Sequence, residues 1–302
     1  MPPKAINYID IWARQLRVAH WWKNLFVFLP LIFSGRIFDP HSLAATVYFF
    51  FLFCLLSSGL YLLNDLRDIG EDRQHPLKKF RPIASGDISG RAGIITGLFF
   101  SLFSLTAAFM TEKTAFWVLS AYLFNTLAYI FYFKARILTD VLSISIGFML
   151  RCIGGALIIG VPLSRFFLIC TFSLFLFLVF AKRRAELEFL STAGEREPGR
   201  IRRTLELYTK EGLDMALSVT AAVCILAYLL FVTDPETSQR HHSGMFIYTV
   251  PVVVYCLFKY MFKARTGEVA GPAGVILRDR GFFWAVFIWL LMVIFIIFKG
   301  GQ

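Results

Sequence analysis

The sequence lacks the features by which secreted domains and metal-binding domains are recognised. Its five cysteines lie inside apolar stretches, and their spacings match no metal-binding motif, so they predict neither a disulfide framework nor a zinc site. The first twenty residues contain no continuous apolar run and no small-residue cleavage site. We therefore expect no secretory signal peptide. With these classes set aside, apolar content becomes the main signal in the chain.

Long apolar segments dominate the 302 residues, 57% of which are hydrophobic, compared with about 45–50% in soluble domains. A helix needs about 20 residues to cross the hydrocarbon core. Most of the segments reach that length, although the first is short. We therefore predict an all-α polytopic membrane protein with nine transmembrane helices, folded as a single integral membrane domain over residues 1–302. The nine segments are centred near residues 24–37, 43–63, 92–110, 115–133, 138–160, 163–181, 213–232, 245–262 and 282–298.

The positive charges are distributed unevenly between the two sides of the predicted bundle. If the connections alternate from side to side, one side carries 25 Lys and Arg and the other five, while Arg151 falls within a helix. Cytoplasmic loops carry the excess of Lys and Arg. This predicts a multi-pass membrane protein with its N-terminus in the cytoplasm. It also accounts for most of the net charge of +11 without a nucleic-acid partner. We expect the membrane to be the bacterial inner membrane.

Acidic residues gather directly after the second apolar segment, in "NDLRDIGED" from Asn64 to Asp72. Asp65, Asp68 and Asp72 are spaced three and four residues apart, which places them on one face of a helix. Three carboxylates together cost free energy unless a cation cancels their charge. Oxygen ligands, with the Asn64 amide as a fourth, suit Mg²⁺, which also bridges to substrate phosphates. The pattern predicts a magnesium site at which the three aspartates are catalytic.

Two further groups of cations accompany this cluster. In "HPLKKFRPIASG", Lys78 and Arg81 could neutralise the rest of a diphosphate, although Lys78 could equally be an ordinary cytoplasmic charge. Arg151 lies midway along a predicted span, where an arginine is costly unless it faces a polar cavity or a partner. We expect it to be a cavity cation, with a structural ion pair as the alternative. The charged loops 64–91 and 182–212 would form the rim of the site.

The sequence N-D-x-x-D-x-x-x-D followed by "HPLKKFRPIASG" resembles the first Asp-rich motif of the UbiA-type intramembrane prenyltransferase superfamily. The resemblance extends over essentially the whole chain. It implies a nine-helix bundle that binds a Mg²⁺-diphosphate at the cytoplasmic mouth of a lipid-open central cavity.

The second Asp-rich motif of that superfamily is missing after the sixth apolar segment. Lys182, Arg183 and Arg184 stand in its place, so that one acidic cluster faces one basic cluster. In this respect, and in stretches such as "RVAHWWKN" and "LELYT", the chain is similar to the polyprenyl-phosphate phosphoribosyltransferase branch. This similarity implies transfer of 5-phosphoribose from phosphoribosyl diphosphate (PRPP) to a polyprenyl phosphate such as decaprenyl phosphate. The products would be polyprenylphosphoryl-5-phosphoribose and diphosphate.

The resemblance also implies which residues bind the substrates. Besides Asn64, Lys78 and Arg81 near the aspartates, it favours phosphate contacts for Lys23 and Asn24. Lys134 belongs to an approximate Y-x-x-x-K motif. The lipid phosphate and the ribose 5-phosphate would be shared among Arg151, Lys182, Arg183 and Arg184, in a division that the sequence does not specify.

Two other functions remain open at this stage. A prenyltransferase that moves a prenyl group from prenyl diphosphate to an aromatic acceptor, in quinone or haem biosynthesis, shares the first motif but should carry the second. A transporter could use Arg151 and the aspartates as an ion path, but we find no matching pair of broken helices. The sequence leaves a homo-oligomer open.

Overall fold

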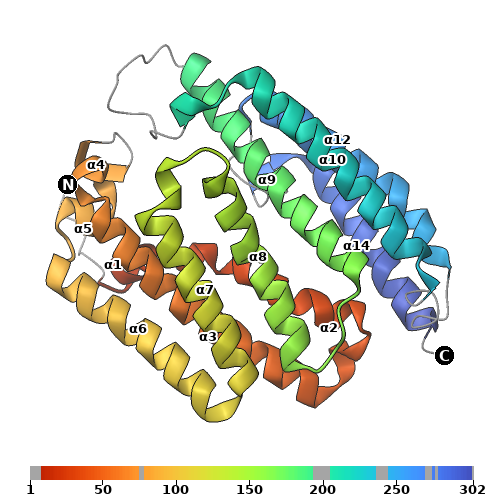
Figure 1. Ribbon diagram of the computed structural model, residues 1–302, viewed down its shortest axis with the longest axis horizontal. Helices are drawn as coiled ribbons and strands as arrows, with labels where there is room; N and C mark the ends of the chain where they lie inside the picture. The colour runs from red at the N-terminus through yellow and green to blue at the C-terminus, as the bar shows by residue number, and fades with distance from the viewer. Residues whose placement is uncertain are drawn as a thin grey trace, which may run out of the picture.

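The computed structural model describes residues 8–74, 78–192, 205–235, 244–268, 274–275 and 278–300. Within this part of the chain, all regular structure is helical. Long helices run side by side in one bundle (Figure 1). Eight of them are long and apolar enough to cross a membrane. They are α3 (Pro40–Arg67), α6 (Gly90–Thr111), α7 (Lys113–Phe131), α8 (Thr139–Ile158), α9 (Arg165–Thr192), α10 (Lys210–Thr233), η6 with α12 (Met245–Thr249 and Val250–Arg265) and α14 (Arg280–Gly300).

The first apolar segment differs from its prediction. It forms the 3₁₀ helix η1 (Val18–Phe28) and the short helix α2 (Leu29–Phe33), which together are shorter than a usual span. Val27 and Leu31 are completely buried, so this segment packs inside the bundle. The predicted polytopic helical class is confirmed, but the count of nine spans is not.

Short helices complete the described chain. Most of them lie at the end of the bundle where α3 finishes and α8 begins. They are α1 (Tyr8–Gln15), η2 (Arg36–Phe38), α4 (Ile69–Gln74), η3 (Lys78–Phe80), α5 (Pro82–Ser85), η4 (Phe133–Ala135) and η5 (Leu205–Leu207).

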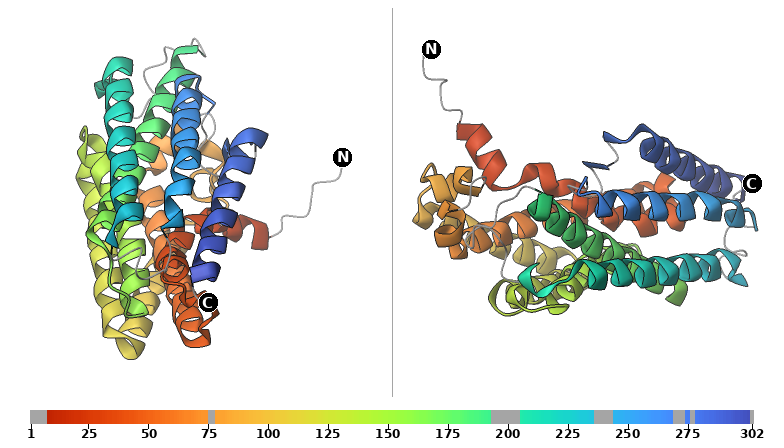
Figure 2. Two further views of the ribbon diagram at one scale, coloured as in Figure 1. Left: turned by 90° about the vertical axis from the view of Figure 1, so that its right-hand side faces the viewer. Right: turned by 90° about the horizontal axis from the view of Figure 1, so that it is seen from above.

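The outer helices carry large apolar side chains on their exposed faces. Only 22% of the apolar stretch of α14 is buried inside the bundle, compared with 56% of the apolar stretch of α3. Figure 2 shows α14 on the outer flank, beyond α12. Phe99 on α6 and Trp117 on α7 are likewise exposed. Such faces are stable in hydrocarbon and would be unstable in water, which supports the membrane assignment.

Polar residues set the starts of the long helices. Asp39 accepts a hydrogen bond from the Ser42 N–H before α3, and Pro40 occupies the first turn, where a missing N–H costs nothing. Thr209 caps α10 in the same way, through the Gly212 N–H. These caps satisfy backbone groups at helix ends and fix where each span begins.

Glycines on α8 bring that helix unusually close to η1. A Cβ atom added to Gly155 would lie 2.0 Å from the carbonyl oxygen of Val27, and one on Gly154 would lie 2.5 Å from the Phe49 ring. These glycines permit the close packing of the two helices. The approach places η1 against α8 one turn below Arg151, and so positions the cavity described next.

We predict that Gly155→Ala lowers the thermal stability of the protein. Its new methyl group would collide with backbone that has no alternative rotamer, and overpacking of this kind costs about 1–3 kcal/mol or more. The midpoint of thermal unfolding in detergent should fall by several degrees. Gly244→Ala is the control, because nothing lies within 4 Å of an added Cβ atom there. Equal midpoints for the two variants would contradict the close contact.

Candidate active site

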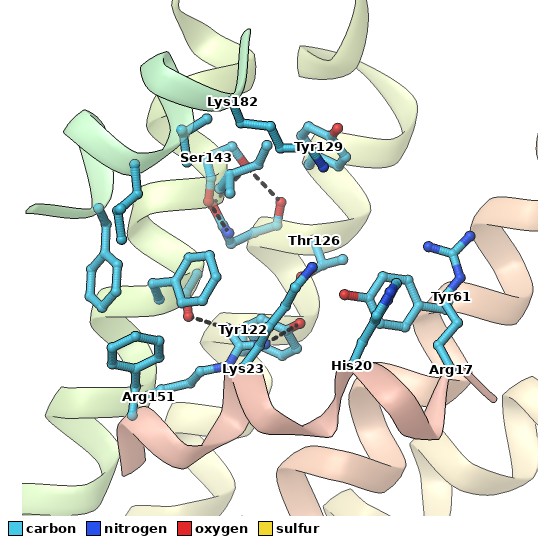
Figure 3. Close-up of a pocket in the computed structure, with 18 of the residues that line it drawn as sticks. Arg17, His20, Lys23, Tyr61, Tyr122, Thr126, Tyr129, Ser143, Arg151 and Lys182 are labelled. Carbon is cyan, nitrogen blue, oxygen red and sulfur yellow. Dashed lines mark hydrogen bonds between the residues drawn. The ribbon is translucent and has the colours of Figure 1, made fainter. Parts of the chain in front are cut away.

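A cavity of about 470 Å³ opens between η1 and helices α7, α8 and α9 (Figure 3). Its charged lining is entirely basic, and no carboxylate is found among the described residues that line it. A cavity with this lining is built to attract anions. The six cationic side chains are Arg17, Lys23, Arg81, Arg151, Lys182 and Arg183.

His20 also lines the cavity and is affected by its charge. Burial, followed by the charges of Lys23 and Arg17, lowers the pKa of His20 to about 4. The imidazole is therefore neutral at physiological pH. It can donate or accept a hydrogen bond, but it adds no charge to the site.

Arg151 is held at the inner end of the cavity by neutral groups. Its guanidinium donates to Asn24 Oδ1 at 2.8 Å, to the Gly147 carbonyl at 2.6 Å and to the Tyr122 hydroxyl at 3.0 Å. It also lies 4.6 Å from the centre of the Tyr122 ring and 5.2 Å from that of Phe148. Among the described residues, no carboxylate pairs with it, so the alternative of a structural ion pair is not supported.

Lys23 adds a second cation at this end. Its side chain extends from η1 into the cavity (Figure 3). No described residue accepts a hydrogen bond from its ammonium group. Lys23 and Arg151 therefore provide positive charge that the surrounding protein does not neutralise, and an anion in the cavity would do so.

The aspartates lie beside this cavity and are engaged by cations. Asp65 is buried, accepts from Gln15 Nε2 at 3.0 Å and forms a close ion pair with Arg17. A single nitrogen of Arg81, Nη1, lies 3.1 Å from Asp65 Oδ1 and 2.6 Å from Asp72 Oδ2. Two of the three carboxylates thus converge on one positive charge.

Asp68 faces a different cation. It accepts from the Asn64 side chain at 3.1 Å and forms a close ion pair with Lys134 of η4. Asp68 ends α3, but the backbone bonds from Asp68 to Asn64 and from Asp72 to Asp68 continue the helical spacing into α4. The three aspartates therefore follow one helical stripe, as predicted. In the described part of the chain, however, no three acidic, His or Cys side chains are grouped closely enough to hold a metal ion.

The donor set nevertheless suits magnesium. All the candidate ligands are oxygen atoms, as Mg²⁺ prefers. The Arg81 nitrogen between Asp65 and Asp72 marks a position where one cation already contacts two carboxylates. These residues fit a divalent cation of which the carboxylates would be the protein ligands.

A second cavity, of about 840 Å³, adjoins the first on the side of α1. Asp65 lines it, and Arg17, His20 and Arg81 line both cavities. The acidic and the basic halves of the site therefore meet at these shared side chains.

The three cations at the end of α9 point in different directions. Lys182 and Arg183 line the cavity, where Arg183 pairs with Asp140 at 3.0 Å. Arg184 instead contacts Glu188 at 2.7 Å and Asp214 of α10 at 3.1 Å, and it lines neither cavity. Consecutive helical residues are rotated by about 100°, so three in a row cannot share one face.

The remaining predicted residues lie around the site, but they do not line either cavity. Asn24 is buried behind Arg151, and Lys134 contacts Asp68. Lys78 is half-buried in η3 and lines neither cavity. The part of loop 182–212 between residues 193 and 204 lies outside the described residues.

Sequence reasoning missed Gln15, Arg17 and Tyr122. The backbone of Arg17 adopts a left-handed conformation (φ 52°), and its side chain contacts Asp65. The guanidinium lies 4.5 Å from the centre of the Tyr61 ring. A non-glycine residue in this conformation leaves no signal in the hydrophobic pattern.

Comparisons with known proteins agree on one family. The profile of the UbiA prenyltransferase family matches residues 25–286. A decaprenyl-phosphate phosphoribosyltransferase of Mycolicibacterium smegmatis is 31% identical over 290 residues, covering 92% of this chain and 89% of the relative. A protein of the same name from Corynebacterium glutamicum is 30% identical, with coverages of 98% and 89%.

Solved structures give the same fold. A UbiA homologue from Archaeoglobus fulgidus bound to DMAPP and Mg²⁺ superimposes with a TM-score of 0.71 at 18% sequence identity, covering 95% of this chain and 98% of that one. At this identity the likeness concerns the fold alone. Together with the family profile, which spans most of the sequence, it leads to one assignment: the chain belongs to the UbiA prenyltransferase family.

Proposed function

We propose that the protein transfers 5-phosphoribose from PRPP to a polyprenyl phosphate, such as decaprenyl phosphate, within the bacterial inner membrane. The observation that carries this proposal is the basic cavity beside the aspartate cluster, since the described residues that line it include no carboxylate. It offers separate places for a metal-bound diphosphate and for phosphates without metal. Relatives named decaprenyl-phosphate phosphoribosyltransferase support the same reading.

The depth of each cation in the bundle suggests which of the two phosphates it binds. Arg183 is bonded to Asp140 near the start of α8, whereas Arg151 lies eleven residues further along the same helix. At a rise of 1.5 Å per residue, Arg151 is about 16 Å deeper. We assign the rim cations Lys182 and Arg183 to the soluble PRPP, and Lys23 and Arg151 to the lipid phosphate.

Asp65, Asp68 and Asp72, with Asn64, would hold Mg²⁺ against the diphosphate of PRPP. When bound there, Mg²⁺ supplies neutralisation of the charge on the leaving diphosphate. Solved UbiA homologues bind Mg²⁺, which supports this choice of metal. Arg17 and Arg81, which pair with these carboxylates, also line the basic cavity, where they could contact phosphate.

The reaction needs little from the protein beyond positioning and electrostatics. An oxygen of the lipid phosphate attacks the anomeric carbon while the bond from that carbon to the diphosphate oxygen breaks, with inversion. The attacking oxygen is already anionic, so no general base is required. Cations fixed around both phosphates hold the reactants together and stabilise the charge that moves between them.

Orientation in the membrane follows the charge distribution. The aspartates, Lys182 and Arg183 lie at the end of the bundle that carries most of the Lys and Arg. We therefore place this end, with the active site and the N-terminus, on the cytoplasmic side. Soluble PRPP would then enter from the cytoplasm, and the lipid phosphate from the bilayer.

We predict that Asp68→Asn abolishes transfer, lowering the rate by about a hundredfold or more because the carboxylate that the metal needs is lost. The measurement is label passing from PRPP into the organic phase, with membranes that contain polyprenyl phosphate. Asp87→Asn is the matched control, since Asp87 is exposed in the same loop and lines neither cavity. Full activity of Asp68→Asn would refute the metal assignment. Label passing from a prenyl diphosphate to an aromatic acceptor would overturn the function itself.

We predict that Lys23→Met raises the KM for polyprenyl phosphate by about tenfold and leaves the KM for PRPP within about twofold. A hydrogen bond to a charged group is worth about 1.5–3 kcal/mol, and Lys23 has no partner among the described residues whose loss would disturb the fold. Initial rates at varied concentrations of each substrate measure both constants. Lys79→Met, at an exposed lysine away from both cavities, should change neither. A shift in the PRPP constant alone would reverse the assignment of the two phosphate sites.

A further inference from the structure

A buried polar network connects the segment before α10 to the wall of the basic cavity. It consists of Tyr208, Asp140 and Arg183, which come from three different parts of the chain. None of the steps described above uses Tyr208 or Asp140. The network is nevertheless almost completely shielded from solvent, and buried polar groups of this kind specify one geometry when all of them are satisfied.

In this network, Arg183 contacts its partners through its guanidinium group. Its side chain is 2% exposed. Nε and Nη2 lie 3.1 and 3.0 Å from Asp140 Oδ2, and Nη1 donates to Glu186 Oε2 at 2.8 Å. Asp140 is fully buried, whereas the Glu186 side chain is 35% exposed. Asp140 is therefore the fixed support of the guanidinium, and Glu186 is the more accessible partner.

Tyr208 in turn supports Asp140. Its hydroxyl donates to Asp140 Oδ1 at 2.9 Å and accepts from the Leu138 backbone N–H, also at 2.9 Å. Leu138 has a positive φ of 64°, an uncommon value for a leucine that needs support from its surroundings. Burial raises the pKa of Tyr208 to about 12, so the hydroxyl keeps the proton that it donates.

We propose that Tyr208 is a positioning residue for PRPP: its hydroxyl holds Asp140, and Asp140 fixes the Arg183 guanidinium at the cavity wall. The inference rests on the proposed function and assigns a role to the "LELYT" stretch. Tyr208 contacts no substrate itself. Its effect reaches the substrate only through the orientation of Arg183.

The neighbouring Arg184 shows by contrast why the network matters to the site. Arg184 joins Glu188 and Asp214, and Asp214 also accepts from Arg265 of α12 at 3.1 Å. That second network ties α9 to α10 and α12 and faces away from the cavity. The Tyr208 network is the one that ends on a cavity-lining cation.

The test is Tyr208→Phe in detergent-purified protein. We expect the Kd for PRPP, measured by titration calorimetry, and the KM for PRPP to rise by about fivefold to tenfold. We expect kcat and the KM for polyprenyl phosphate to stay within about twofold. A purely structural role would instead reduce the amount of folded enzyme and lower the apparent kcat without a selective change in PRPP affinity.

Tyr260→Phe is the matched control. Its hydroxyl is buried in the same apolar cluster as Tyr208 and has no hydrogen-bond partner in the part of the chain that the structure describes. Removing it deletes an equal group without breaking a bond. The variant should bind PRPP like the original protein.

A double-mutant cycle with Arg183→Lys tests whether Tyr208 acts through the Arg183 guanidinium. If Tyr208 acts through the guanidinium, Tyr208→Phe should have little further effect on PRPP affinity in that background. An equal shift in both backgrounds, or unchanged PRPP affinity in folded Tyr208→Phe, would overturn the proposal. Should Tyr208→Phe fail to fold, Asp140→Asn is measured in the same cycle, with the same expected weakening and the same overturning results.

The measurement of PRPP binding distinguishes failure of this inference from failure of the proposed function. If the original protein binds PRPP but forms no lipid product from it, the proposed reaction fails while the positioning role is still decided by the shift in Kd. If the original protein does not bind PRPP at all, both fail together.

Discussion

The rest of this structure depends on positive charge that is held inside a membrane bundle and has no acidic partner among the described residues. Arg151 can occupy the interior because three neutral oxygen atoms accept its hydrogen bonds and aromatic faces surround its plane. These contacts satisfy its donors but do not cancel its charge. An anion in the cavity would neutralise this charge. The close approach of η1 to α8 at Gly155 forms the wall of that cavity.

The two halves of the site treat charge in opposite ways. At the aspartates, each carboxylate is paired with a cation from another element, as with Lys134 on Asp68. At the inner end of the basic cavity, Lys23 and Arg151 have no such carboxylate among the described residues. Arg17 and Arg81 lie between the two halves and line both cavities. These two arginines therefore connect the carboxylates to the basic cavity.

The sequence predicted the parts that depend on local pattern. Apolar runs located most of the long helices to within a few residues, as for 282–298 against Arg280–Gly300. The exception is α9, which continues to Thr192, well beyond its predicted end at residue 181. The spacing of the aspartates predicted their common stripe. The pattern failed where tertiary contacts decide: Arg17 meets Asp65 from 48 residues away, and Arg184 is turned from the cavity by helical rotation. The first segment could not be predicted because a 3₁₀ helix buried inside the bundle has the composition of a short span.

The basic cluster on α9, Lys182 to Arg184, contributes less unpaired positive charge to the site than its sequence indicates. Arg183 is paired with Asp140 and Glu186, and Arg184 with Glu188 and Asp214, so acidic residues offset much of what "AKRRAEL" adds. The charge that protein groups leave uncompensated lies about 16 Å deeper, at Arg151 and its neighbour Lys23. A soluble acceptor would have to carry its phosphate down from the rim to reach it. An acceptor that is itself a lipid brings its phosphate to the membrane level, which is why the depth of these cations favours a polyprenyl phosphate over a soluble acceptor.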